Sequence, residues 1–294
     1  VAAYFLAAEE SAAERMLRWF TWFGCAIALL GVLAYYGSPG KILWLWEAPY
    51  PDTWGPFLSR NNFAQFLELC FPVALWFANK RGDPWIYGAA ALAMLVAGLV
   101  SASRAGAAVL MGELVVAAVW MGRRRRKLVS MVAVSAILLG AALGAETLAG
   151  RLMRNELVDE RGDLYRSSIQ MVVARPWTGF GLGTYRSVYP EFATFDSGYT
   201  IEHAHNDWLE WAAEGGVGFV AIWGWLCLRA IRTAKLWSIG IPAVFLHAIV
   251  DFPTARTGIA AWLFLLLGLV EATSLFTSET SLQGQFEGTK GEVR

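Results

Sequence analysis

Long apolar stretches recur along the chain, separated by short polar segments. Eight of them are long enough to cross a hydrocarbon layer of about 30 Å as helices. None alternates polar and apolar residues as a strand of a membrane barrel would. The pattern predicts an all-α polytopic membrane protein with about eight transmembrane helices. They are expected at residues 16–36, 62–79, 84–102, 105–122, 128–146, 215–231, 236–252 and 258–276.

Basic residues between the predicted helices set the orientation. The densest group, residues 123–127, lies between the fourth and fifth helices. With strict alternation, the other basic groups fall on the same side: Arg15 and Arg18, Lys80 and Arg81, and Arg229, Arg232 and Lys235. Cytoplasmic loops are enriched in Lys and Arg, so this side is predicted to be cytoplasmic. A short basic loop between two spans does not indicate a nucleic-acid partner.

This topology divides the chain into four parts. Residues 1–146 would hold the N-terminal transmembrane helices, residues 147–214 a long periplasmic loop, and residues 215–276 the C-terminal transmembrane helices. Residues 277–294 would form a polar cytoplasmic tail. Because the sequence starts at Val1, the N-terminal part is expected to be incomplete.

Composition agrees with a membrane protein. Hydrophobic residues make up 56% of the chain and charged residues 16%, whereas about a quarter of an ordinary soluble domain is charged. The three cysteines, Cys25, Cys70 and Cys227, all lie inside apolar stretches. They are interpreted as small hydrophobic residues of helices, because they show no disulfide or metal spacing.

The end of the long loop carries two of the three histidines, in His203-Ala204-His205-Asn206-Asp207-Trp208-Leu209-Glu210. A neutral imidazole can accept a proton near neutral pH, and a His-x-His pair beside carboxylates also suits zinc. Residues two apart on a helix point to different faces, so a shared metal would need an extended or cap geometry. The spacing leaves open a catalytic base, a metal site and structural capping.

A glycine-rich run, Gly179-Phe180-Gly181-Leu182-Gly183, lies in the same loop. It resembles a phosphate-binding loop, but it lacks the preceding strand without which such a motif is weak evidence. A turn after Pro176 is the favoured interpretation over a nucleotide cradle. Nearby aromatic residues could stack on sugar rings or pack as a loop core; they are Tyr185, Tyr189, Phe192, Phe195 and Tyr199.

Three arginines are expected on the outer side, against the positive-inside bias. Arg60 precedes the second predicted helix, Arg104 lies where two apolar stretches meet, and Arg161 lies in the long loop. Each could reach up to the membrane interface, but planar guanidinium groups also suit bidentate binding of phosphate. Together with a histidine base, they suggest chemistry on a lipid-linked phosphate.

His247 and Asp251 lie four residues apart near the outer end of the seventh predicted helix. This spacing would allow one hydrogen-bonded pair on a helix face. A structural pair inside the membrane is favoured over a direct catalytic role.

Five motifs in order resemble the O-antigen ligase and polymerase family of bacterial envelope glycan enzymes. They are residues 55–64, where Ser59 and Asn62 depart from the family pattern; residues 101–106, where Ala105 replaces a glycine; and residues 161–183, 203–218 and 247–253. Family members join glycans to lipid A core, to other polysaccharide or to protein. The motifs do not distinguish among these activities.

The resemblance implies a GT-C-like helical fold in the bacterial inner membrane. An undecaprenyl-pyrophosphate-linked oligo- or polysaccharide would be transferred to a hydroxyl of a lipid, glycan or protein acceptor on the periplasmic face, with no metal or other cofactor. By position, His205 would be the catalytic base, and Arg161 and Arg104 would hold the pyrophosphate. Substrate-binding roles are implied for Arg60, Asn61, His203, Asn206, Glu210, His247 and Asp251.

The implied chemistry agrees with the residue types. Negative charge grows on the pyrophosphate as the glycosidic bond breaks, and fixed guanidinium groups would stabilise it. A base on the opposite side suits direct displacement with inversion at the anomeric carbon. A transporter or flippase of lipid-linked glycans is the alternative, but it would be expected to show charges near mid-bilayer and repeated halves. A catalytically silent scaffold would leave the outer arginines and the histidine pair without a role.

Overall fold

The computed structural model describes residues 10–49, 53–80, 83–152, 157–194, 198 and 200–272. The described part is made of helices and loops, as the sequence predicted, and of one very short hairpin that it did not predict. The elements in chain order are α2 (Glu10–Gly37), β1 (Lys41–Ile42), β2 (Trp46–Glu47), α3 (Arg60–Asn79), α4 (Pro84–Val100), α5 (Arg104–Leu152), α6 (Leu157–Ala174), α7 (Tyr185–Phe192), α8 (Asp207–Arg232), η1 (Leu236–Ser238), α9 (Gly240–His247), η2 (Pro253–Ala255) and the Thr257–Ala272 helix. The predicted tail, residues 277–294, lies outside the described residues.

Four helical segments are long and apolar enough to cross a membrane: Ala12–Gly37, Arg104–Arg123, Arg125–Gly144 and Asp207–Arg232. At most a third of the most apolar window of each is buried inside the protein. Their outward apolar side chains therefore suit a hydrocarbon surround. The predicted class, a helical membrane protein, is confirmed, and the count of eight spans stays a prediction.

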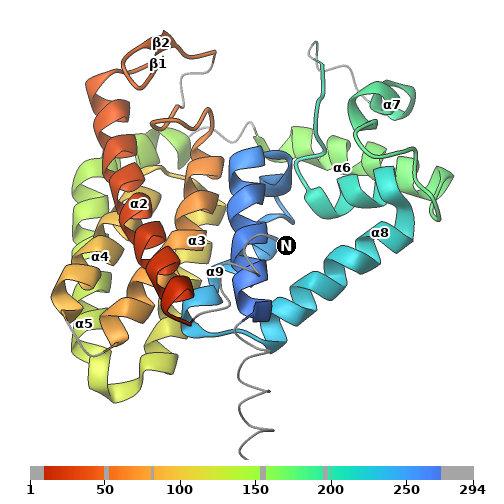
Figure 1. Cartoon of the computed structure of the whole chain (residues 1–294). Coiled ribbons are helices and arrows are strands. Elements are labelled where there is room, and N and C mark those ends of the chain that lie inside the picture. The colour runs from red at the N-terminus through yellow and green to blue at the C-terminus, as the bar shows by residue number, and fades with distance from the viewer. Residues whose placement is uncertain are drawn as a thin grey trace, which may run out of the picture.

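α3 occupies the centre of the bundle (Figure 1). It packs against α2, α4 and α5 and also against η1 and α9. Sixteen of its 20 residues are buried, because it is apolar on nearly every face and a helix of that kind has to be surrounded. Two polar residues on it, Gln65 and Glu68, are fully buried as well, and both have partners that bear on the site.

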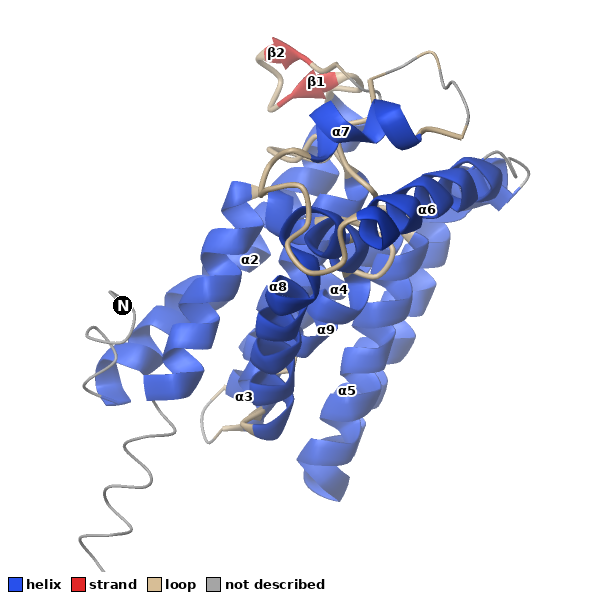
Figure 2. Ribbon diagram, turned by 90° about the vertical axis from the view of Figure 1, so that its right-hand side faces the viewer, coloured by secondary structure: helices blue, strands red, loops and turns tan. Residues whose placement is uncertain are grey.

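The long loop is folded rather than extended. Figure 2 shows α6 and α7 at the same end of the bundle as the β1–β2 hairpin. Tyr185 and Tyr189 are buried with Leu164 and Met171 in a small core of this region, and Phe192 packs against it. The loop-core interpretation of these aromatic residues is thus confirmed for three of them, while Phe195 and Tyr199 lie outside the described residues.

Two of the predicted helices differ from the structure in ways that bear on the site. The sixth helix begins at Asp207 instead of residue 215, because the side chain of Asn206 accepts a hydrogen bond from Leu209 N at 3.1 Å and caps it. The predicted span 236–252 is instead η1, α9 and a series of turns after His247. These turns expose carbonyl groups to α8: Asp207 N donates to Ala248 O at 2.9 Å and to Asp251 O at 3.1 Å.

α8 is interrupted at Gly216, where the backbone adopts φ 69° and ψ −172°. A Cβ atom at this position would lie 2.3 Å from the carbonyl oxygen of Trp177. The glycine therefore allows the long loop to pack directly against the helix backbone. It also separates the motif-bearing first turns of α8 from the apolar remainder.

We expect Gly216→Ala to destabilise the protein by at least about 1–2 kcal/mol, the cost of a left-handed backbone with a side chain, before the contact with Trp177 is counted. Gly218→Ala is the matched control, because nothing lies within 4 Å of the position that its new methyl group would take and its backbone is helical. Alanine should leave stability unchanged or raise it there. Apparent melting temperatures in detergent would compare the two, and equal values would contradict the role given to Gly216.

Candidate functional site

The glycine-rich run forms a turn that is held by α8. Gly179, Gly181 and Gly183 all have positive φ angles. The carboxylate of Glu214 accepts hydrogen bonds from Gly183 N at 2.9 Å and Tyr185 N at 2.8 Å. Gly181 N donates to the backbone oxygen of Glu214 at 2.8 Å. The amide groups that a phosphate would need are thus bound to the protein itself, which favours the turn over the nucleotide cradle.

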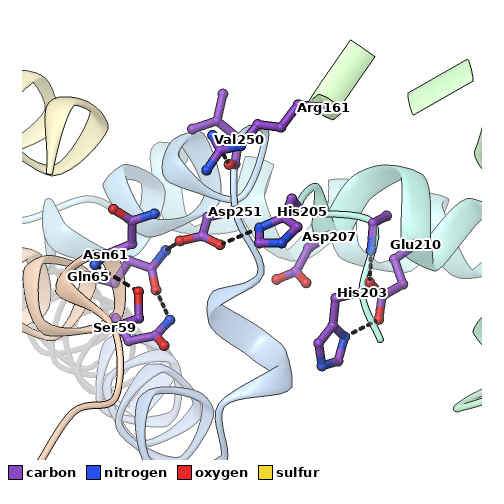
Figure 3. Close-up of polar contacts among 12 residues, drawn as sticks. Ser59, Asn61, Gln65, Arg161, His203, His205, Asp207, Glu210, Val250 and Asp251 are labelled. Atoms are coloured by element: carbon purple, nitrogen blue, oxygen red, sulfur yellow. Dashed lines mark hydrogen bonds and ion pairs between the residues drawn. The ribbon is translucent and has the colours of Figure 1, made fainter. Parts of the chain in front are cut away.

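His205 lies immediately before the Asn206 cap, in a left-handed backbone conformation with φ 52°. The ring of Phe252 packs against both loop histidines. His203 stacks on it with ring centroids 4.5 Å apart, and His205 meets it edge-on at 4.8 Å. The two imidazoles therefore have different surroundings, and Figure 3 shows them turned toward different partners.

His205 faces Asp251. Its Nδ1 lies 3.6 Å from Asp251 Oδ1, a distance typical of an ion pair and slightly too long for a hydrogen bond. The imidazole is 39% exposed while the carboxylate is buried. Tyr165 donates its hydroxyl to the backbone oxygen of His205 at 3.1 Å, which ties this residue to α6.

Asp251 is held from the opposite side by α3. Gln65 Nε2 donates to Asp251 Oδ2 at 3.2 Å, and Asn62 Nδ2 donates to Gln65 Oε1 at 3.0 Å. Burial raises the pKa of Asp251, but the nearby imidazole of His205, the charge of His247 and a hydrogen bond from Asn61 outweigh it, and the net pKa is lowered. Asp251 is therefore ionised at neutral pH and can orient an imidazole.

Arg161 joins the same turn from α6. Its Nη1 donates to the carbonyl oxygen of Val250 at 3.2 Å, next to Asp251 (Figure 3). The side chain is half-buried. One cluster thus forms from residues far apart in the sequence. Arg161 comes from α6, Gln65 from α3, His205 from the segment before α8, and Asp251 from the turn after α9.

His203 forms a separate pair with Glu210. Its Nδ1 lies 2.9 Å from Glu210 Oε1, and the other oxygen of Glu210 accepts from Ala204 N at 2.8 Å. Burial lowers the pKa of His203, but the hydrogen bond and charge of Glu210 outweigh burial and the net pKa is raised. Near pH 6.5 a larger share of His203 is therefore protonated than of a free imidazole, and a smaller share can accept a proton.

The raised pKa predicts a pH dependence of stability. A pKa raised by folding contributes stability that is complete below the unfolded value, about 6.5. That contribution is lost as pH rises through the folded value. Glu210→Gln should bring the His203 titration down and flatten the loss of stability above pH 6.5. Histidine ring proton NMR and apparent melting temperatures at pH 5.5 and 8 would check this. An unchanged His203 titration in the variant would refute the assignment.

The predicted pair of His247 and Asp251 is wrong. His247 Nδ1 instead lies 2.7 Å from Glu68 Oε1 of α3, and both side chains are fully buried. α9 ends at His247, so the turns that follow take Asp251 off the helix face. His247 thus pairs with Glu68, while Asp251 belongs to the His205 cluster.

Arg60 and Arg104 are the first residues of α3 and α5. The ends of these helices are joined by Ser103 Oγ, which donates to Asn61 Oδ1 at 2.8 Å. Small residues permit this approach, since a Cβ at Gly106 would lie 2.4 Å from the Cβ of Ala64. The structure thus connects the first and second sequence motifs directly.

Residues 88–226 match the family model described as O-antigen ligase. This part of the chain is similar to that family. A comparison with curated proteins finds no match. The matched segment contains Arg104, Arg161 and both loop histidines, and the contacts of Asp251 and Gln65 come from outside it.

Sequence reasoning missed several residues that complete this candidate site. Gln65 and Tyr165 hold Asp251 and His205, and Asp207 accepts hydrogen bonds from Thr254 N at 2.9 Å and Thr254 Oγ1 at 2.7 Å. A signal for Gln65 was present, because an amide within an apolar helix needs a partner. Within the described residues, no group of three or more His, Cys, Asp or Glu is arranged to hold a metal ion. Metal independence itself stays a prediction.

Proposed function

We propose that this protein transfers a glycan from an undecaprenyl-pyrophosphate carrier to an acceptor hydroxyl at the periplasmic face of the bacterial inner membrane. The match of residues 88–226 to the O-antigen ligase family supports glycan transfer in general. The cluster of His205, Asp251 and Arg161 is the observation that carries the more specific proposal. We also propose a GT-C-like arrangement of about eight spans, with the long loop on the periplasmic side.

His205 would act as the general base. With Nδ1 directed at the ionised Asp251, the proton of a neutral imidazole is placed on Nδ1 and the lone pair on Nε2. Nε2 would take the proton of the acceptor hydroxyl while the oxygen of that hydroxyl bonds to the anomeric carbon. The Nδ1–Oδ1 distance of 3.6 Å supports this assignment, because such contacts are often long before substrate binds.

Arg161 and Arg104 would bind the leaving pyrophosphate. As the bond between the anomeric carbon and the phosphate oxygen breaks, its electron pair stays on that oxygen. A guanidinium fixed in advance stabilises this charge most in the transition state. The hydrogen bond of Arg161 to Val250 O supports its role, since it fixes the side chain beside the proposed base. Arg60 and Asn61, at the end of α3, would line the same side.

The decisive experiment reconstitutes the full chain in proteoliposomes with a lipid-pyrophosphate glycan and a set of lipid, glycan and protein acceptors. Transfer that continues in EDTA is the expected result. Transfer that stops with EDTA and returns with a divalent cation would overturn metal independence. Movement of the glycan across the bilayer without transfer to any acceptor would favour a transporter or flippase instead.

A further inference from the structure

The β1–β2 hairpin, which follows α2, ends in an exposed apolar tip made of residues 43–46. Leu43, Trp44, Leu45 and Trp46 follow one another, and the last three are 44%, 70% and 60% exposed. The hairpin lies at the same end of the bundle as α6 and α7 (Figure 2). A run of large apolar side chains on an exposed turn indicates a surface that binds something other than water.

The backbone of this tip is strained. Leu43 and Trp44 have φ angles of 50° and 65°, in the left-handed region that glycine and asparagine adopt more readily. Short hairpin turns that need such angles are usually built from those residues. Large apolar side chains are therefore kept here against the preference of the backbone, which is typical of a functional surface.

The tip folds back to the end of α2. A Cβ atom on Gly37, the last residue of that helix, would lie 3.3 Å from the indole Nε1 of Trp44. The chain reverses between them at Gly40, where φ is 74°, and Lys41 N donates to Ser38 O at 3.0 Å. The apolar tip therefore lies level with the last turn of the helix.

The length of α2 sets the depth of this tip. The chain has no charged residue between Arg18 and Lys41. The helix from Trp19 to Gly37 rises about 28 Å, close to the thickness of the hydrocarbon layer of a bilayer. Leu33 on this stretch is 63% exposed, as a side chain that faces lipid would be. The end of α2, and the tip with it, therefore lies where hydrocarbon meets headgroups.

We propose that the hairpin tip is a membrane-binding element that docks into the phospholipid headgroup layer of the leaflet at this end of the bundle. Indole rings favour this layer, because their apolar body can contact the chains while their N–H bonds to headgroup oxygens. Lys41 pairs with Glu47 at the opposite end of the hairpin, with Nζ and Oε1 3.7 Å apart, and this charged end would face water. The docked tip would hold the end of α2 at a fixed depth. This inference is independent of the proposed transfer function.

The test measures the depth of the tip in nanodiscs of phosphatidylethanolamine and phosphatidylglycerol that hold one copy of the full chain. An environment-sensitive fluorophore on Leu45→Cys would be quenched from the membrane by nitroxide lipids and from water by iodide. We expect strong quenching by a nitroxide at the headgroup or at the top of the acyl chain, and weak quenching by iodide. Quenching by iodide alone would overturn the proposal. The unsubstituted protein gives the background from its three cysteines, which lie in helices.

Ser187→Cys is the matched control for the fluorophore itself. Ser187 is an exposed residue of α7, which lies at the same end of the bundle (Figure 2). Its label should be quenched by iodide and not by nitroxide lipids. Equal lipid quenching at both positions would mean that the fluorophore enters the membrane by itself, and it would refute the evidence for docking.

Trp46→Ser removes one ring from the tip and leaves the strained turn unchanged. Together with the label on Leu45→Cys, it should cause the loss of most of the lipid quenching and a gain in iodide quenching. Trp85→Ser is the matched control, because Trp85 is 57% exposed at the start of α4, at the opposite end of the bundle, and it should change neither. Unchanged quenching in Trp46→Ser would contradict the docking role of the tip.

A second copy of the chain is the other surface that could cover the tip. Nanodiscs loaded with two copies distinguish this case. The same lipid quenching with one copy and with two would support docking into the headgroup layer. A label that is quenched by iodide with one copy, and is shielded from both quenchers with two, would show a contact between copies and would overturn the proposal.

Discussion

His205→Asn is expected to lower kcat for glycan transfer by roughly 10²–10⁴, the usual contribution of a general base. Asparagine is chosen because it tolerates the left-handed backbone at this position better than alanine does. Donor binding should change little, since the proposed role of His205 is to take a proton from the acceptor. Transfer to a defined acceptor in proteoliposomes, followed over pH and at several donor concentrations, would measure kcat and donor binding.

Asp251→Asn tests the same proposal through the orienting residue. The amide keeps the shape of the side chain but removes the charge that fixes the imidazole tautomer. We expect a large fall in kcat. A variant of either residue with wild-type kcat, correctly folded by its melting temperature, would show that the base lies elsewhere.

Arg161→Ala is expected to lower transfer by about 10²–10³, the range seen when one group that stabilises developing negative charge is removed. Arg161→Lys should recover little of this loss, because an ammonium cannot reproduce two parallel hydrogen bonds to a phosphate. The rate should be measured at saturating and at limiting donor. An effect that appears only at limiting donor would mean that Arg161 binds the ground state and not the leaving group.

Arg166 provides the matched control for this loss. It lies on the same helix, is well exposed, and pairs with Asp163 at 3.1 Å. Exposed ion pairs contribute at most about 1 kcal/mol, so Arg166→Ala should retain near wild-type transfer. Equal losses in both variants would point to damage to α6 and not to a pyrophosphate site.

The hydrophobic pattern was sufficient to predict where most helices lie. It was misleading at residues 236–252, where a largely apolar sequence gives no sign that α9 ends at His247. What ends the helix is a tertiary interaction, the use of the Ala248 and Asp251 carbonyls by Asp207. No local periodicity reports such a bond, since the partner is some forty residues away in the sequence.

The site was predictable in its residue types and only partly in its pairing. His205 and Arg161 could be singled out because a histidine and an outer arginine have few structural duties in such a loop. Their meeting at the turn of Val250 and Asp251 depends on how α6 crosses the end of the bundle. The i, i+4 spacing of His247 and Asp251 suggested a local pair, whereas Glu68 of the central helix provides the actual partner.

Glu214 occupies the place that an anionic ligand would take in the glycine turn. The carboxylate of Glu214 makes the hydrogen bonds that such a ligand would make, so the turn can be ordered before any substrate binds. If the donor binds beside Arg161, as proposed, it need not use binding energy to order this part of the loop. In this respect the loop is preorganised, and more of the interaction with the donor is left to favour the reaction itself.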